Sequence, residues 1–106
     1  MVFFDDLETR SGDERAAELA DILPSQIARA KALGGYKTTL ADITARDITS
    51  ATALAQLPVL RKSVLSQAQG SASPLGGFTT RNVTGFGHIF QSPGPIYEPG
   101  GIEIDW

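Results

Sequence analysis

The chain contains no cysteine. It therefore has no disulfide, no thiolate metal site and no cysteine nucleophile. The absence of cysteine is consistent with a protein of a reducing compartment. Histidine is almost as scarce, because His88 is the sole one, and this excludes a zinc site built from three histidines. His88 lies within an apolar stretch without nearby paired carboxylates, so a structural role for it in a strand is favoured over a catalytic one. The sequence predicts no catalytic residue and no metal ligand.

The chain also lacks an excess of basic residues and a long apolar run. Nine Lys and Arg residues against 12 Asp and Glu give a net charge of −3, and the positive residues are scattered. Nucleic acid is therefore not expected as a partner. No apolar run approaches the roughly 18 residues that a membrane span needs, so no membrane partner is expected. The start, MVFFDDLETR, has acids where a secretory signal has a basic region, and a cytoplasmic location is expected.

Helix signals fill the first 70 residues. Ser11 followed by Glu14 is a capping-box pattern and predicts a helix start. Pro24 is expected to stop or kink this helix and to open a second one, giving a helical pair over residues 12–33 that ends at the glycines 34 and 35.

A further helical region is predicted over residues 50–69. Asp47 or Thr49 can cap its first segment, and Pro58 breaks that segment. Ser63 is then a plausible cap for the turn VLSQAQ, which Gly70 ends.

From Phe78 the composition changes to β-branched and aromatic residues among glycines, and at least one strand is predicted between about Val83 and Gln91. The following stretch, SPGPIYEPG, contains three prolines, which carry no N–H. It is interpreted first as a stiff connector. The second interpretation is an anion-binding loop, for which Ser92 and Gly94 would be suited.

The last residues, GGIEIDW, alternate apolar and acidic side chains as a short half-buried strand does. If the stiff connector holds this arm away from its own core, the arm can be exchanged with a second copy. Self-association through residues 100–106 is therefore expected, with a frayed, solvated tail as the alternative.

Three segments of the sequence carry a resemblance to a known family. They are LPVLRK, with Leu57, Pro58 and Lys62; SPLGGF, with Pro74, Gly76 and Gly77; and HIFQSPGPIYEPGG, with Ile89, Phe90, Gln91 and Ser92. In this order they are similar to the amino-terminal portion of phenylacetate-CoA ligase-like proteins, members of the AMP-dependent, adenylate-forming acyl-CoA synthetase superfamily. The resemblance runs from about residue 6 to residue 100.

This resemblance implies an α+β fold in which a helical amino-terminal half packs on a small β-sheet, as at the start of the large domain of adenylate-forming ligases. Residues 1–106 would then be a single partial domain, helical over 1–70, with loop and β structure over 71–106. The implied function is that of an amino-terminal fragment or truncated relative of an acyl- or aryl-CoA ligase, inactive alone. The alternative is a small protein–protein interaction or self-associating module without a catalytic role.

The resemblance also bears on cofactors and partners. Ordinary family members carry S-S-G-T-T-G after the strand, and its hydroxyls and amides hold the phosphates of ATP. One branch carries SPGPIYEPEG there, and this chain looks like that branch, with Gly100 in place of the glutamate. Ser92 and Gly94 are the counterparts of the phosphate loop. No cofactor is expected for the isolated chain. Binding of ATP, magnesium and CoA is expected only if the chain is part of a complete ligase. The expected partner is a missing carboxy-terminal portion or a second copy.

Overall fold

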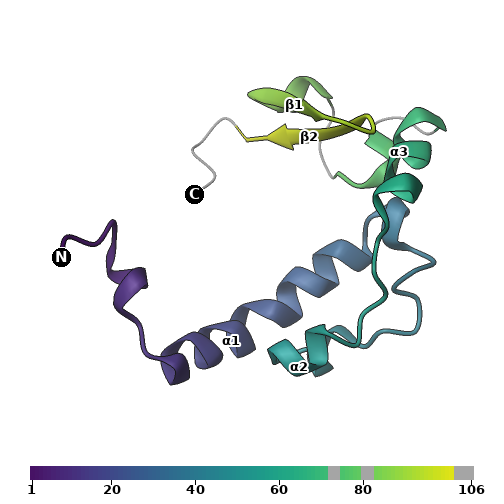
Figure 1. Ribbon diagram of the computed structural model, residues 1–106. Helices are drawn as coiled ribbons and strands as arrows, with labels where there is room; N and C mark the ends of the chain where they lie inside the picture. The colour runs from purple at the N-terminus through teal and green to yellow at the C-terminus, as the bar shows by residue number, and fades with distance from the viewer. Residues whose placement is uncertain (72–74, 80–82, 102–106) are drawn as a thin grey trace. The chain divides into compact units, whose positions relative to one another are not determined.

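The structure, a computed structural model, describes residues 1–71, 75–79 and 83–101 (Figure 1). Its regular elements are α1 (Gly12–Lys31), α2 (Ala51–Leu54), α3 (Lys62–Ser71), β1 (His88–Ser92) and β2 (Ile96–Gly100), joined by loops and short 3-10 turns. Over these residues the fold is α+β, with three helices and one antiparallel sheet of two strands. The α+β class is thus confirmed, while the likeness to a ligase domain stays a prediction.

The chain divides into two compact units. The first comprises Met1–Arg29 and Asp42–Leu57, and the second comprises Ala30–Ala41 and Pro58–Trp106. The single domain expected over residues 1–106 stays a prediction.

The first unit begins α1 with the predicted capping box. The backbone N–H of Ser11 donates to Glu14 Oε2 at 2.7 Å, and the backbone N–H of Glu14 donates to Ser11 Oγ at 3.2 Å. The Ser11 hydroxyl also donates to Glu14 Oε2, at 2.8 Å. These bonds satisfy amide groups that have no partner within the helix, so the expected helix start is confirmed.

The expected stop at Pro24 and the helical pair expected over residues 12–33 are wrong, because α1 continues through Pro24 as one helix. A proline inside a helix costs about 3 kcal/mol, since it lacks the N–H and its ring meets the preceding turn. The neighbouring side chains of Leu23 and Ile27 are only 8% and 6% exposed. Burying a side chain of this kind contributes roughly 1.5–3 kcal/mol. The two together are enough to offset the cost of the proline, and the helix persists.

The core of the first unit forms around these two residues. Leu23 and Ile27 pack against Ile48, and partly buried apolar side chains complete the cluster: Ile43, Ala45, Ala53 and Leu57. The short helix α2 supplies one of them, Ala53. Ser50 caps α2, because its hydroxyl oxygen accepts from the backbone N–H of Ala53 at 3.1 Å. The prediction of Asp47 or Thr49 as the cap is therefore wrong, by three residues or by one.

The second unit contains α3 and the two strands. Helix α3 starts at Lys62 and ends at Ser71, so Ser63 lies inside its first turn and Gly70 in its last. The predicted cap at Ser63 is two residues after Arg61, which precedes the helix, and the predicted end at Gly70 is one residue early, which is the ordinary uncertainty of helix ends. Leu40 is buried in this unit, at 5% exposure.

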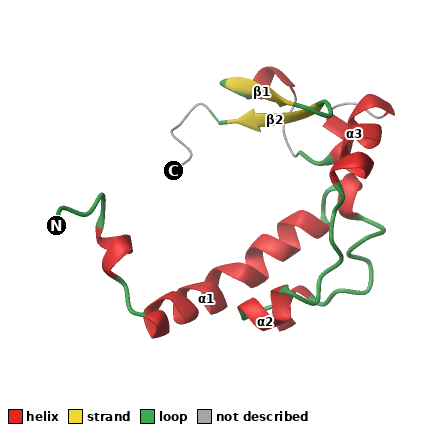
Figure 2. Cartoon of the chain, viewed as in Figure 1, coloured by secondary structure: helices red, strands yellow, loops and turns green. Residues whose placement is uncertain are grey.

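The stretch that follows β1 is a β-hairpin rather than a connector (Figure 2). Strand β1 pairs antiparallel with β2 in a register that places His88 opposite Gly100 and Ser92 opposite Ile96. Residues 93–95 form the turn, which includes a cis peptide bond between Gly94 and Pro95. The strand predicted between Val83 and Gln91 exists but is shorter, because Val83–Gly85 form a 3-10 turn. The stiff connector expected from Ser92 to Pro99 is therefore wrong over residues 96–99, which belong to β2.

The predicted arm lies mostly outside the described residues, which end at Gly101 after Gly100 closes β2. Residues 102–106 of that arm are therefore not part of this description. Among the helices that the structure does describe, none is both long and apolar enough to span a membrane.

Replacing Glu14 with glutamine should reduce the acid sensitivity of the start of α1. Hydrogen bonds from the Ser11 backbone and hydroxyl, with a smaller contribution from the nearby Arg10, lower the pKa of Glu14 below its ordinary value. A carboxyl group with a lowered folded-state pKa stabilises the fold above its ordinary pKa, and this contribution is lost as the pH falls through the lowered value. Far-ultraviolet circular dichroism during an acid titration should therefore show a smaller loss of helix in Glu14→Gln than in the native chain.

Asp13→Asn is the matched control, since it removes the same charge from the same first turn without touching the capping box. It should keep the acid-dependent loss of helix. Identical titration curves for the native chain and Glu14→Gln would contradict the role assigned to Glu14.

Candidate functional site

Helix α3 holds the hairpin through two of its polar side chains. The Gln69 amide exchanges two hydrogen bonds with the backbone of Tyr97: Oε1 accepts from the Tyr97 N–H at 2.8 Å, and Nε2 donates to the Tyr97 carbonyl at 2.9 Å. One helical turn earlier, the Ser66 hydroxyl lies 3.2 Å from the Gly94 carbonyl and 3.0 Å from the Pro95 carbonyl. The hairpin turn and the middle of β2 are thus both fixed to α3.

The Gln69 contact establishes which way the residues of the hairpin face. In an antiparallel pair, the N–H and C=O of one residue point to the same side of the strand. Because Gln69 takes both groups of Tyr97, Tyr97 faces away from β1. Two residues further, Pro99 faces outward as well, so its missing N–H removes no bond from the β1–β2 ladder. The outer edge of β2 is therefore occupied at Tyr97 and has no donor at Pro99.

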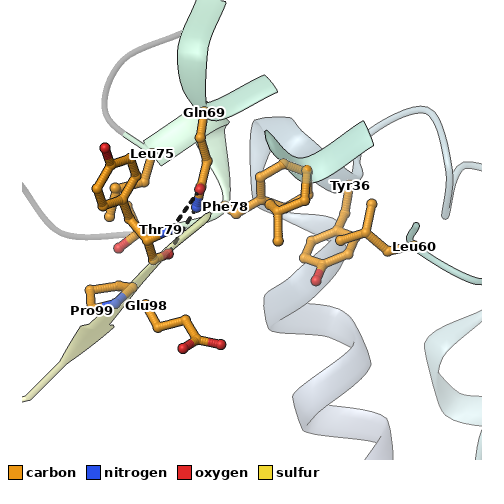
Figure 3. A pocket seen from close by; sticks show the side chains of 10 residues that line it. Tyr36, Leu60, Gln69, Leu75, Phe78, Thr79, Glu98 and Pro99 are labelled. Carbon is orange, nitrogen blue, oxygen red and sulfur yellow. Dashed lines mark hydrogen bonds between the residues drawn. The ribbon is translucent and has the colours of Figure 1, made fainter. Parts of the chain in front are cut away.

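A cavity of about 210 Å³ lies beside this contact (Figure 3). Its apolar lining comes from leucine and aromatic side chains, and its polar lining from Gln69, Thr79 and Glu98. Glu98 is the one charged residue among those that line the cavity, and its side chain is exposed. Sites for drug-sized ligands measure about 300–1,000 Å³, so this cavity can take only a small group.

Close backbone approaches shape one wall of the cavity. The rings of Tyr36 and Phe78 meet edge to face, with centroids 4.9 Å apart and planes at 87°. Gly35 lies directly against Phe78, because a Cβ on Gly35 would come within 2.7 Å of ring carbons of Phe78. Gly77, with φ 82°, approaches Gly35 in turn, and a Cβ on Gly77 would lie 3.0 Å from the Gly35 nitrogen. Only glycine fits at these contacts.

The structure places both predicted phosphate-loop residues at the hairpin turn. Ser92 is half-buried at the end of β1, and Gly94 occupies the turn with φ 152°, a conformation that favours glycine. Lys62 lies over the same turn, since a Cβ on Gly94 would come within 3.0 Å of Lys62 Cε. A positive side chain is thus adjacent to Gly94, while the Gly94 carbonyl accepts from Ser66.

His88 lies at the start of β1 and is exposed, and the structural role favoured for it from the sequence stays a prediction. Its ring packs against Phe90 at a centroid distance of 4.6 Å and covers Gly100, which is buried. Within residues 1–71, 75–79 and 83–101, no group of three His, Asp or Glu side chains is placed so that it could hold a metal ion.

Sequence reasoning missed Ser66 and Gln69, the residues that organise the hairpin. Each contacts a residue 28 or 29 positions later in the chain. The residues next to Ser66 and Gln69 in sequence give no indication of these contacts. The one signal was their spacing: positions 66 and 69 share a face of a helix, so two polar side chains project from it together.

No family model matches the chain, and neither the curated proteins nor the solved structures contain a match to it. The family suggested by the three sequence segments therefore stays a prediction.

Replacing Gly35 with alanine should destabilise the second unit by about 1–3 kcal/mol, the usual cost of overpacking. The added methyl group would displace the Phe78 ring and open the wall that it forms with Tyr36. Gly34→Ala is the matched control, because a Cβ at Gly34 meets nothing within 4 Å. In urea unfolding followed by circular dichroism, Gly35→Ala should have a lower midpoint than the native chain, and Gly34→Ala should not. Equal midpoints for the two variants would contradict the close approach.

Replacing Gln69 with alanine should release β2 from α3. It removes two hydrogen bonds, each with a net contribution of about 1 kcal/mol, so we expect faster hydrogen exchange at the Tyr97 amide and a loss of about 1–3 kcal/mol. Gln67→Ala changes an exposed glutamine of the same helix and should leave that exchange rate unchanged. Equal Tyr97 exchange in the two variants, measured by NMR, would show that Gln69 does not hold the strand.

Proposed function

We propose that this chain is the amino-terminal part of an AMP-dependent acyl- or aryl-CoA ligase of the phenylacetate-CoA ligase-like kind. Such an enzyme activates a carboxylate with ATP to an acyl-adenylate and pyrophosphate, and then transfers the acyl group to CoA with release of AMP. The proposal assigns this reaction to a longer protein and gives these 106 residues no activity of their own. In that protein ATP, magnesium and CoA would be bound largely by other residues.

The observation that carries the proposal is the convergence of the three resembling segments on α3. Lys62, from the first, starts this helix and lies over the hairpin turn. Gly76, from the second, packs on the other end of α3, since a Cβ there would lie 2.9 Å from the Ala68 carbonyl carbon. The third segment forms the hairpin that Ser66 and Gln69 hold. Segments separated in sequence thus form one local structure, as parts of a shared site do.

Two described features favour Ser92 and Gly94 as the counterpart of a nucleotide loop. The turn that contains them is held in place by Ser66 rather than free to move, and a positioned turn can orient a ligand. Lys62 adds a positive charge beside it, which favours a phosphate there. The prolines at positions 93 and 95 supply no N–H, so the chain alone holds too few donors for a triphosphate.

A test of this proposal starts from the protein in the cells that make it. An antibody raised against this chain should detect a protein several times larger than 106 residues, and the immunoprecipitate should catalyse aryl acid-dependent exchange of pyrophosphate into ATP. The purified 106-residue chain should catalyse none. Detection of only a protein of this chain's own size, with no exchange in the precipitate, would refute the assignment, and non-immune serum is the control.

The second candidate function is a self-associating module. One observation favours it: the aromatic side chain of Phe90, in the middle of β1, is 60% exposed on a strand, HIFQS, that contains no Asp, Glu, Lys or Arg.

A further inference from the structure

The outer edge of β1 is unprotected, in contrast to that of β2. The register pairs Gln91 with Tyr97 and Ile89 with Pro99. Since Tyr97 faces away from β1, its partner Gln91 faces away from β2, and Ile89 does the same two residues earlier. The N–H and C=O groups of Ile89 and Gln91 therefore point outward. In the part of the chain that the structure describes, no third strand and no side chain pairs with them.

Strand β1 also lacks the devices by which proteins usually block an edge. Exposed edges commonly carry charged residues, prolines or covering side chains. Strand β2 has Pro99 and the Gln69 amide, whereas β1 is HIFQS and has neither proline nor a formal charge with His88 neutral. Its central side chains are apolar and accessible: Phe90 is 60% and Ile89 39% exposed. This edge is a surface suited to the addition of another strand.

We propose that a second copy of this chain pairs with this edge, β1 against β1, in an antiparallel register centred on Phe90. The result is a continuous sheet made of both hairpins, with a two-fold axis at Phe90. This contact differs from the carboxy-terminal arm predicted from the sequence, and it does not rest on the ligase assignment.

The register follows from which residues face outward. Centring on Phe90 places Ile89 opposite the partner's Gln91, and Gln91 opposite the partner's Ile89. Both are the outward-facing residues, so each pair can exchange both of its backbone hydrogen bonds. Phe90 then lies opposite the partner's Phe90 in a non-hydrogen-bonded pair, where side chains are closest and aromatic pairs are favourable. A centre at Ile89 or Gln91 would still pair outward-facing residues with each other, but it would move Phe90 away from the partner's Phe90 and lose the aromatic pair.

The charges of the strand favour a second copy as the occupant. A symmetric contact brings the same charges of both copies into one interface, so an edge with several charges of one sign would repel itself. The one titratable residue of β1, His88, lies opposite the partner's uncharged Ser92 in this register. Glu98, opposite Phe90 in the hairpin, would be separated from the partner's Glu98 by three strand spacings, or roughly 14 Å, beyond the Debye length at physiological salt.

The first experiment compares two substitutions at Gln91. Gln91→Pro removes an outward N–H that the hairpin itself does not use, whereas Gln91→Ala keeps that N–H and removes only the side chain. Light scattering over a concentration series should show a dimer for the native chain and for Gln91→Ala, and a monomer for Gln91→Pro. Slow exchange at the Tyr97 amide in Gln91→Pro checks that its hairpin remains folded on α3.

The second experiment tests the register with cysteines, which the native chain lacks. Opposed residues of a non-hydrogen-bonded pair have Cα atoms about 4.5 Å apart, within the range of a disulfide. Phe90→Cys should therefore form a disulfide dimer on mild oxidation. His88→Cys and Ser92→Cys should each fail to do so alone but should form a mixed disulfide when combined.

Several results would overturn this inference. They are a native chain that stays monomeric up to millimolar concentration, a dimer that survives Gln91→Pro, and a dimer in which His88→Cys links to itself as readily as to Ser92→Cys. A dimer lost when the chain is shortened after Gly101 would assign the contact to the carboxy-terminal arm and also overturn it. None of these results bears on the size or the exchange activity of the cellular protein, so the two proposals fail separately.

Discussion

The pair of hydrogen bonds between the Gln69 side chain and the Tyr97 backbone is the constraint on which the second unit depends. A glutamine amide presents one acceptor and a donor in the same arrangement as a peptide group, so it can occupy a strand edge as a neighbouring strand would. This contact fixes β2 to α3 at its middle, and Ser66 fixes the turn. The orientation of every residue in the hairpin follows from it, as does one side of the cavity that Tyr97, Glu98 and Pro99 line.

The features that could be predicted from the sequence are those whose causes lie within a few residues. The capping box joins Ser11 to Glu14, three positions away, and local chemistry determines it. Pro24 shows where local rules fail. Its cost to a helix is a local property, but the burial of Leu23 and Ile27 against Ile48 comes from a segment more than 20 residues away. The α+β class was therefore predictable, whereas the continuity of α1 required knowledge of its packing.

The hairpin is not predicted from the sequence, because three prolines within seven residues indicate a loop. A proline damages a strand only where its N–H would have served the ladder. Here Pro93 and Pro95 lie in the turn, and Pro99 faces the outer edge. The positions of the prolines, rather than their number, decide whether β structure can form. The sequence does not indicate toward which side of the hairpin the backbone groups of Tyr97 point. The contact that determines this is made by Gln69, 28 positions away.

The open edge of β1 connects the two proposals physically. Backbone groups at a strand edge are satisfied either by water or by another strand, and a strand adds burial of the neighbouring side chains to the hydrogen bonds. In a longer ligase, a strand from the same protein could satisfy Ile89 and Gln91 and cover Phe90. In the 106-residue chain, a second copy offers the same donors and acceptors in a matching register. The two modes compete for one edge, so a longer protein that covers β1 would not associate through it. An uncharged, apolar strand edge such as that of β1 is therefore suited to pairing with another strand. Whether that strand comes from the same protein or from a second copy depends on whether the rest of the protein supplies one.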